Sequence, residues 1–174
     1  MNLAIDPTNS VAIIADSMNA VQAGDNWKQI PDDKIYVVDL KAKPPKLVST
    51  IQGDKQPSGL SINPAGNLAL VANRAAKSIS VLSIHGTDVK LIGSIDMGDE
   101  VSAVVFTPDG KHALATKPSV NKVALLDVDG DKVTYNKHDL LTGLYPYNTV
   151  IAPNGSIALA AIPTAMWIRL ASSI

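Results

Sequence analysis

Short apolar runs alternate with polar turns along the chain, and the turns that hold a proline recur in a regular order. The same order of apolar run, proline turn and apolar run is found in LAIDPTNSVAIIAD (3–16), LSINPAGNLALVAN (60–73), VVFTPDGKHALATK (104–117) and VIAPNGSIALAAI (150–162). The turn prolines are Pro7, Pro64, Pro108 and Pro153, so successive copies are 57, 44 and 45 residues apart. A period in this range predicts a repeat architecture in which each copy is one structural unit.

Each of the first three copies continues with a third apolar run and then a fourth run that alternates between apolar and polar residues. The third runs are IYVVDL (35–40), ISVLSI (79–84) and VALLDV (123–128), and the fourth are KLVSTIQ (46–52), VKLIGSI (89–95) and KVTYNKH (132–138). This pattern predicts four short antiparallel strands per unit, with Pro and Gly at the turns. Inner strands that are apolar on both faces, followed by an alternating outer strand, are typical of sheets packed around an axis. We therefore predict an all-β fold, a β-propeller with about three and a half four-stranded blades.

The repeat units run over about 3–56, 57–100, 101–146 and 147–174, and together they form one domain over 1–174. The first unit is about 13 residues longer than the others, and the excess falls in a polar stretch at 17–34. We expect this stretch to be a mobile loop insertion on the ligand-facing side, because it has no repeat pattern to pack it. Trp27 is expected to act as its local packing anchor.

Equivalent apolar positions of the first and second strands define the expected core. These are Ile5, Val11, Ile13, Leu60, Ile62, Leu70, Val104, Phe106, Leu114, Val150 and Leu159.

LALVAN (68–73) after INPAGN (62–67), together with VVFTPDGKHAL (104–114), resembles the repeat of the YVTN β-propeller family, a relative of the lactonase-like seven-bladed proteins. The resemblance covers residues 3 to about 162. It implies binding, surface-layer or hydrolytic roles, an acidic or amide-rich central site that often holds metal, and a periplasmic or extracellular location for full-length relatives. No catalytic motif of the family matches residue by residue, so catalytic residues stay unassigned.

Three and a half blades are about half of such a ring, and the chain appears in this comparison as a short or truncated form. Open end sheets expose apolar faces and unpaired edges, which symmetric self-association commonly covers. The sequence therefore predicts a homodimer that completes a propeller, with the apolar tail 165–174, including Trp167 and Leu170, at the contact.

The connections from strand 2 to strand 3, and from strand 4 to the next strand 1, lie on one face of a propeller blade. The proline turns belong to the opposite face and are repetitive, so functional variation is expected on the first face. A mixed-charge mouth there suits a small polar ligand or a divalent cation such as Ca or Mg. The candidate ligand-binding residues on this face are Asp16, Asn73, Arg74, Glu100, Lys117, Tyr145, Tyr147 and Asn148.

Two short motifs have simpler structural explanations. Ser119-Val-Asn-Lys122 matches the Ser-x-x-Lys of some serine hydrolases, but that motif needs a helix and this one is expected on a loop. The D-x-D-x-D run at 127–131 begins like a calcium loop, but Lys132 and His138 stand where that loop needs glycine and glutamate. A tight hairpin turn explains the run better.

Histidine and cysteine chemistry is not predicted. The three histidines, His85, His112 and His138, fall on separate turns and strand ends, which disfavours a shared metal site or a Ser-His-Asp arrangement. The absence of cysteine excludes disulfides and thiolate nucleophiles and leaves the compartment open.

Charge and hydropathy narrow the function further. Fifteen Lys and Arg against 16 Asp and Glu give a net charge of −1, which disfavours nucleic acid as a partner. The sequence as given shows no signal peptide and no apolar run long enough for a membrane span. The leading hypothesis is a binding and assembly module. The alternative is a lactonase-like or esterase-like hydrolase acting on a small ester or lactone, so enzymatic activity remains open.

Overall fold

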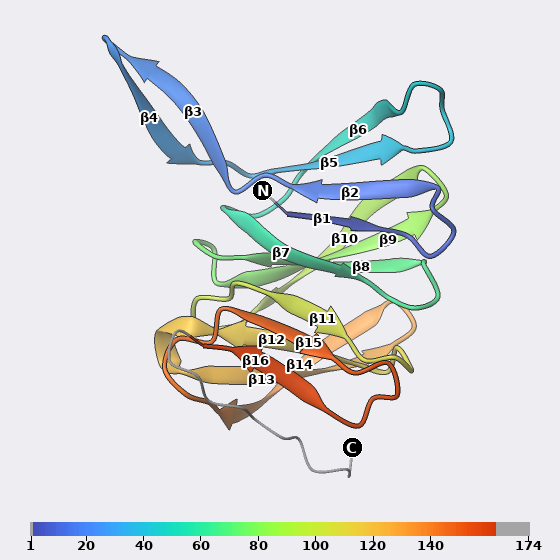
Figure 1. Ribbon diagram of the computed structural model, residues 1–174, viewed down its shortest axis with the longest axis vertical. Coiled ribbons are helices and arrows are strands. Elements are labelled where there is room, and N and C mark those ends of the chain that lie inside the picture. The colour runs from blue at the N-terminus through green and yellow to red at the C-terminus, as the bar shows by residue number, and fades with distance from the viewer. Residues whose placement is uncertain (1, 163–174) are drawn as a thin grey trace.

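The computed structural model describes residues 2–162, and these form antiparallel sheets that follow the predicted repeat (Figure 1). The first sheet contains β1 (Asn2–Ile5), β2 (Val11–Ala15), β5 (Lys34–Asp39) and β6 (Lys46–Gln52). The second contains β7 (Pro57–Ile62), β8 (Leu68–Asn73), β9 (Ser78–His85) and β10 (Asp88–Asp96). The third contains β11 (Val104–Phe106), β12 (His112–Lys117), β13 (Lys122–Asp129) and β14 (Lys132–Leu141). We call these sheets blades 1, 2 and 3.

A fourth sheet pairs β15 (Asn148–Ile151) with β16 (Ala158–Ala161), and we call it blade 4. The single 3-10 turn of the described residues, Pro118–Val120, connects β12 to β13. No helix within residues 2–162 is long and apolar enough to span a membrane. The predicted partial β-propeller is confirmed.

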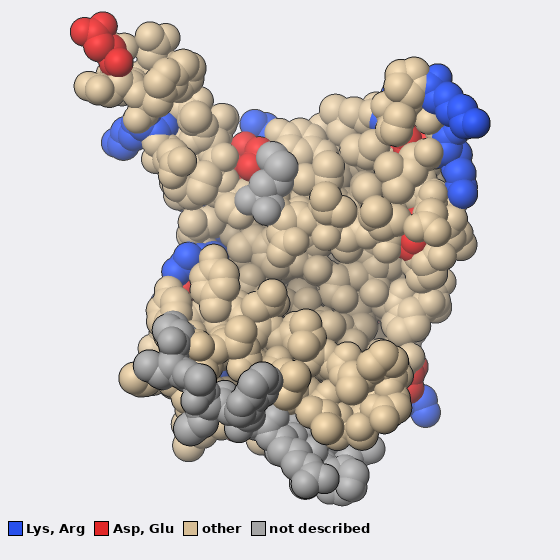
Figure 2. All heavy atoms as spheres, in the orientation of Figure 1, with Lys and Arg blue, Asp and Glu red and all other residues tan. Residues whose placement is uncertain are grey.

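The first strands lie next to one another along the axis of the propeller. β7 contacts β1 and β11, and β11 contacts β15. Figure 2, in the same orientation, shows that charged side chains lie mainly toward the margins of this view, and that the surface over these first strands is largely uncharged. The repeat therefore places the start of each blade, and the linker before it, around one axis.

The proline turns have a common local cause. The residue two positions after each turn proline has a left-handed backbone, with φ 54° at Asn9 and 75° at Gly66. Glycine and asparagine tolerate this region better than other residues. The residue before the proline also accepts backbone hydrogen bonds in the first two turns: Asp6 from Val11 at 2.6 Å and Asn63 from Leu68 at 3.1 Å. These bonds fix where each second strand begins.

The core lies between the blades, in one apolar cluster per interface. Seven of the expected core residues are buried, and Ile62 and Leu159 are half-buried. Ile5 and Val150 were expected in the core and are not: they are 47% and 56% exposed. Both lie on outer faces of the end blades, which no described sheet covers.

The insertion differs from the expected irregular loop. β3 (Met18–Ala23) and β4 (Asn26–Pro31) form a hairpin that pairs only with itself and projects from blade 1 (Figure 1). Trp27 is 71% exposed, so the expectation that it anchors local packing is wrong. Cross-strand pairing, rather than a buried side chain, organises this segment.

Candidate ligand-binding site

Three linkers between blades place one side chain each at equivalent positions on the loop face. Gln56, Glu100 and Tyr145 each lie eight residues before the turn proline of their repeat. Tyr145 has a left-handed backbone, φ 57°, and its N–H donates to Asn121 Oδ1 at 2.8 Å. A non-glycine residue in this region costs free energy that the surrounding structure must offset. The position of Tyr145 is therefore fixed by the loop that precedes β13.

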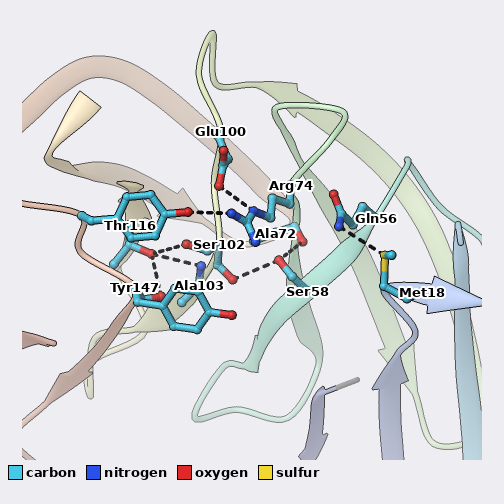
Figure 3. A network of polar contacts seen from close by, with 11 residues as sticks. Met18, Gln56, Ser58, Ala72, Arg74, Glu100, Ser102, Ala103, Thr116 and Tyr147 are labelled. Atoms are coloured by element: carbon cyan, nitrogen blue, oxygen red, sulfur yellow. Dashed lines mark hydrogen bonds and ion pairs between the residues drawn. The ribbon is translucent and has the colours of Figure 1, made fainter. Parts of the chain in front are cut away.

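Arg74, directly after β8, joins two of these linkers. Its Nε donates to Glu100 Oε1 at 2.5 Å, and its Nη2 donates to Tyr145 Oη at 2.7 Å (Figure 3). Burial alone would lower the pKa of Arg74, but the hydrogen bond and the charge of Glu100 outweigh it and raise that pKa. The guanidinium stays charged and in place. We call Arg74, Glu100 and Tyr145 the mouth cluster.

Hydroxyl groups tie neighbouring blades together beside the mouth cluster. Ser58 Oγ lies 3.0 Å from the carbonyl oxygens of both Ala72 and Ser102. Thr116 Oγ1 accepts the N–H of Ala103 at 3.1 Å, and it lies 3.4 Å from the carbonyl oxygen of Tyr147. Figure 3 shows this chain of contacts next to Arg74 and Glu100. It fixes the spacing of the blades on which the cluster is built.

Tyr147 and Asn148 lie at the start of blade 4, close to this hydroxyl network. Tyr147 is 57% exposed, and Figure 3 shows its ring beside Ser102 and Ala103. Asn148 is exposed, and its Oδ1 accepts the N–H of Thr149 at 2.8 Å. The structure thus brings Arg74, Glu100 and Tyr145 into contact and places Tyr147 near them.

Two other candidates point into their blades instead of toward the mouth. Asn73 is fully buried, and its Nδ2 donates to Ser78 Oγ at 3.2 Å and to Ser80 Oγ at 2.9 Å. Lys117 occupies the equivalent place in blade 3, with a side chain only 3% exposed.

The ammonium nitrogen of Lys117 lies 3.0 Å from Tyr135 Oη and 3.1 Å from carboxylate oxygens of both Asp99 and Asp139. These groups make Lys117 the buried centre of an ionic network, in which the Asp139 side chain is 8% exposed and the Asp99 side chain is 40% exposed. Asp16 is the matching residue of blade 1; it is half-buried at the base of the hairpin, where its N–H donates to Lys34 O at 3.1 Å.

Sequence reasoning missed the hydroxyl network of Ser58, Ser102 and Thr116, and it missed Gln56. A signal was present, because Ser58 and Ser102 each lie six residues before a turn proline. No three His, Asp or Glu side chains within residues 2–162 come together as a metal site.

Comparison with known proteins finds similarity of structure only. No family model matches the chain, and no curated protein sequence matches it. Hydrazine synthase from Kuenenia stuttgartiensis is 22% identical, with a TM-score of 0.71, over 91% of this chain and 40% of that one.

Two further structures extend the similarity to lactonases. A Bacteroides uniformis protein assigned provisionally as a 6-phosphogluconolactonase is 20% identical, with a TM-score of 0.72, over 91% of this chain and 46% of that one. The periplasmic gluconolactonase of Pseudomonas aeruginosa is 17% identical, with a TM-score of 0.66, over the same two shares. The chain thus spans less than half the length of these three structures, and what it shares with them is the fold.

Proposed function

We propose that this chain is a β-propeller module for binding and assembly, whose loop face recognises a small polar ligand at the mouth cluster. The observation that supports this proposal is the partly exposed Arg74, held by Glu100 and Tyr145 from two other linkers. A guanidinium has five N–H donors, and the two named bonds use two of them. The remaining donors suit a ligand oxygen.

The class of ligand follows from the net charge of the mouth cluster and from the two tyrosine rings beside it. Glu100 neutralises Arg74, so the cluster does not favour a strongly charged ligand. Tyr145 and Tyr147 offer partly exposed aromatic faces with hydroxyl groups at their ends. Such a set suits a small uncharged molecule with several hydroxyl groups, such as a sugar or a sugar lactone.

The test is calorimetric titration of the full chain with a panel of neutral monosaccharides and sugar lactones. Arg74→Met is expected to weaken binding at least about tenfold, the loss of one charge-assisted hydrogen bond. Lys90→Met is the matched control, since Lys90 is an exposed cation paired with Asp88 on the outer strand of blade 2. Equal affinity of Arg74→Met and the native chain would reject this site.

Hydrolysis of a small lactone or ester is the second candidate, supported by a carboxylate and a guanidinium in direct contact. In that reaction Glu100 would take a proton from the attacking water, and Arg74 would stabilise the developing oxyanion. A lactone and ester screen of the native chain, repeated with Glu100→Gln, tests it. Turnover that survives in Glu100→Gln would remove Glu100 from this role.

A divalent cation such as Ca or Mg is a possible addition to this proposal. Carboxylate oxygens are the ligands these cations prefer, but Oε1 of Glu100 is engaged by Arg74, so only Oε2 of Glu100 is left to bind a cation in this cluster. Metal analysis of the purified chain tests this part. A periplasmic or extracellular location is proposed by analogy with the periplasmic gluconolactonase.

Assembly is proposed as formation of a homodimer. The sequence placed the tail 165–174 at the contact between the two copies, and this tail lies outside the described residues.

A further inference from the structure

The outer face of blade 1 is an apolar sheet surface without a described neighbour. Strand register places Leu3 opposite Ile14 and Ile5 opposite Ala12, so these residues share one face. Tyr36 and Val38 of β5 continue the same face, opposite Ile14 and Ala12. Leu3 and Ile5 are exposed there.

The equivalent face of blade 2 is already an interface. Counted from the turn prolines, Leu3, Ile5, Ala12 and Ile14 correspond to Leu60, Ile62, Ala69 and Val71. Those four residues pack against blade 1, in the cluster that also contains Val11 and Ile13. The outer face of blade 1 therefore has the side-chain pattern of a surface that receives another blade.

Blade 4 presents the matching counterpart at the other end of the chain. Val150 and Leu159 are cross-strand partners on its outer face, and Val150 is exposed. By the same count they correspond to Ala4 and Ile13 of blade 1, which pack against blade 2. One end thus repeats the receiving half of an internal blade contact, and the other end repeats the inserting half.

We infer that two copies of this chain pair head to tail, with blade 4 of each copy packed on the outer face of blade 1 of the other. The inference rests on the assembly role proposed above and specifies its surfaces. A closed arrangement of this kind repeats one heterologous contact twice around a two-fold axis.

The hairpin β3–β4 gains a role in this pair. It projects beyond blade 1, on the side where the partner's blade 4 would lie (Figure 1). Register places Met18 and Trp27 on one face of the hairpin, and both are exposed. In the pair, the hairpin would bring Trp27 of one copy near the linker that leads to blade 4 of the other.

The experiment measures the mass of the full chain in solution by light scattering. The native chain is expected at twice 18.3 kDa. Ile5→Glu and Val150→Glu each place a charge in both contacts and are expected at the single-chain mass. Ile92→Glu is the matched control, because Ile92 is 46% exposed on the outer strand of blade 2, and it should pair like the native chain.

The two single variants can also be mixed in equal amounts. A mixed pair has one intact contact, blade 4 of Ile5→Glu on blade 1 of Val150→Glu, and one contact that carries both glutamates. The mixture should therefore pair through the intact contact alone, more weakly than the native chain. Circular dichroism tests whether each variant folds. If Ile5→Glu does not fold, Ile5→Ser replaces it, and if Val150→Glu does not fold, Val150→Ser replaces it.

Three outcomes would overturn the inference. A native chain at the single mass or in a broad high-mass distribution rejects the pair, and so does a pair that survives Ile5→Glu. An effect of Ile5→Glu without one of Val150→Glu would indicate contact between two blade 1 faces instead. Arg74→Met should lose ligand and keep the pair, so the ligand site and the pairing fail independently.

Discussion

Lys117 ends β12 with its ammonium group inside blade 3, and its charge there depends on its neighbours. Burial alone would lower the pKa of Lys117, but the hydrogen bonds of Tyr135, Asp99 and Asp139 outweigh it and raise that pKa. Asp139 shows the reciprocal effect: burial would raise its pKa, and bonds from Tyr135 and Lys117 lower it. The ammonium links the linker before β11 to the outer strand β14.

Replacing Lys117 tests this structural role at the scale of one residue. Lys117→Met leaves two carboxylates without their central cation, and it should lower the free energy of unfolding by about 3 kcal/mol. Lys122→Met is the control, since Lys122 lies 3.6 Å from the same Asp139 carboxylate and is 38% exposed. Lys122→Met should lower the free energy of unfolding by less than about 1 kcal/mol. Urea titration of the native chain and both variants measures these differences. An equal loss of unfolding free energy in the two variants would show that Lys117 does not stabilise the fold through this network.

At the scale of one element, the first proline turn depends on the ionised carboxyl of Asp6. Burial favours a higher pKa, but the hydroxyl of Thr8 and the N–H groups of Val11, Ser10 and Thr8 lower the pKa of Asp6 to about 2. In the second turn the amide oxygen of Asn63 accepts the N–H groups of Asn67 and Leu68. The first and second proline turns therefore have equivalent backbone hydrogen bonds, but Asp6 of the first turn can take up a proton and Asn63 of the second cannot.

This difference predicts a pH dependence of stability. Because the folded pKa of Asp6 is depressed, its contribution is complete above the ordinary aspartate range and is lost as the pH falls toward 2. The melting temperature of Asp6→Asn should lie below that of the native chain at neutral pH, and the gap should narrow as the pH falls from about 4 to 2. Asn63→Ala is the control, with a loss that stays constant over this interval. A constant gap for Asp6→Asn would contradict the assignment.

At the scale of the whole molecule, the hairpin is an addition to a blade that is complete without it. β2 pairs directly with β5, and the corresponding connections in blades 2 and 3 are the short segments 74–77 and 118–121. A two-stranded hairpin alone is marginal in water, so its exposed apolar residues suit contact with another surface.

Replacing residues 19–30 by a four-residue connection should leave the body folded and weaken pairing. At protein concentrations too low for pairing, the melting temperature of the shortened chain should be close to that of the native chain. Light scattering should give a higher dissociation constant for the pair of shortened chains. Trp27→Ala alone should weaken pairing in the same direction. If the shortened chain unfolds, the hairpin belongs to the folding core and its assignment as an arm is wrong.

The sequence by itself determined the repeat, its strands and most of its core. These features depend on local patterns, since a proline turn sets where a strand begins and alternation sets which side chains share a face. Val11, Leu70 and Phe106 could be assigned to the core for that reason, and they are buried. Arg74, Glu100 and Tyr145 could be assigned to one face because their linkers share an end of the blades.

Only the tertiary structure decided what those faces meet. Ile5 and Ile62 hold equivalent places, yet Ile5 is exposed, because burial depends on a neighbouring sheet that no local pattern encodes. Lys117 and Arg74 are both cations at ends of second strands, but one turns into its blade and the other reaches Tyr145, 71 residues away. Contacts between distant residues arise when the blades pack around the axis, so the sequence could nominate the mouth cluster and only packing could assemble it.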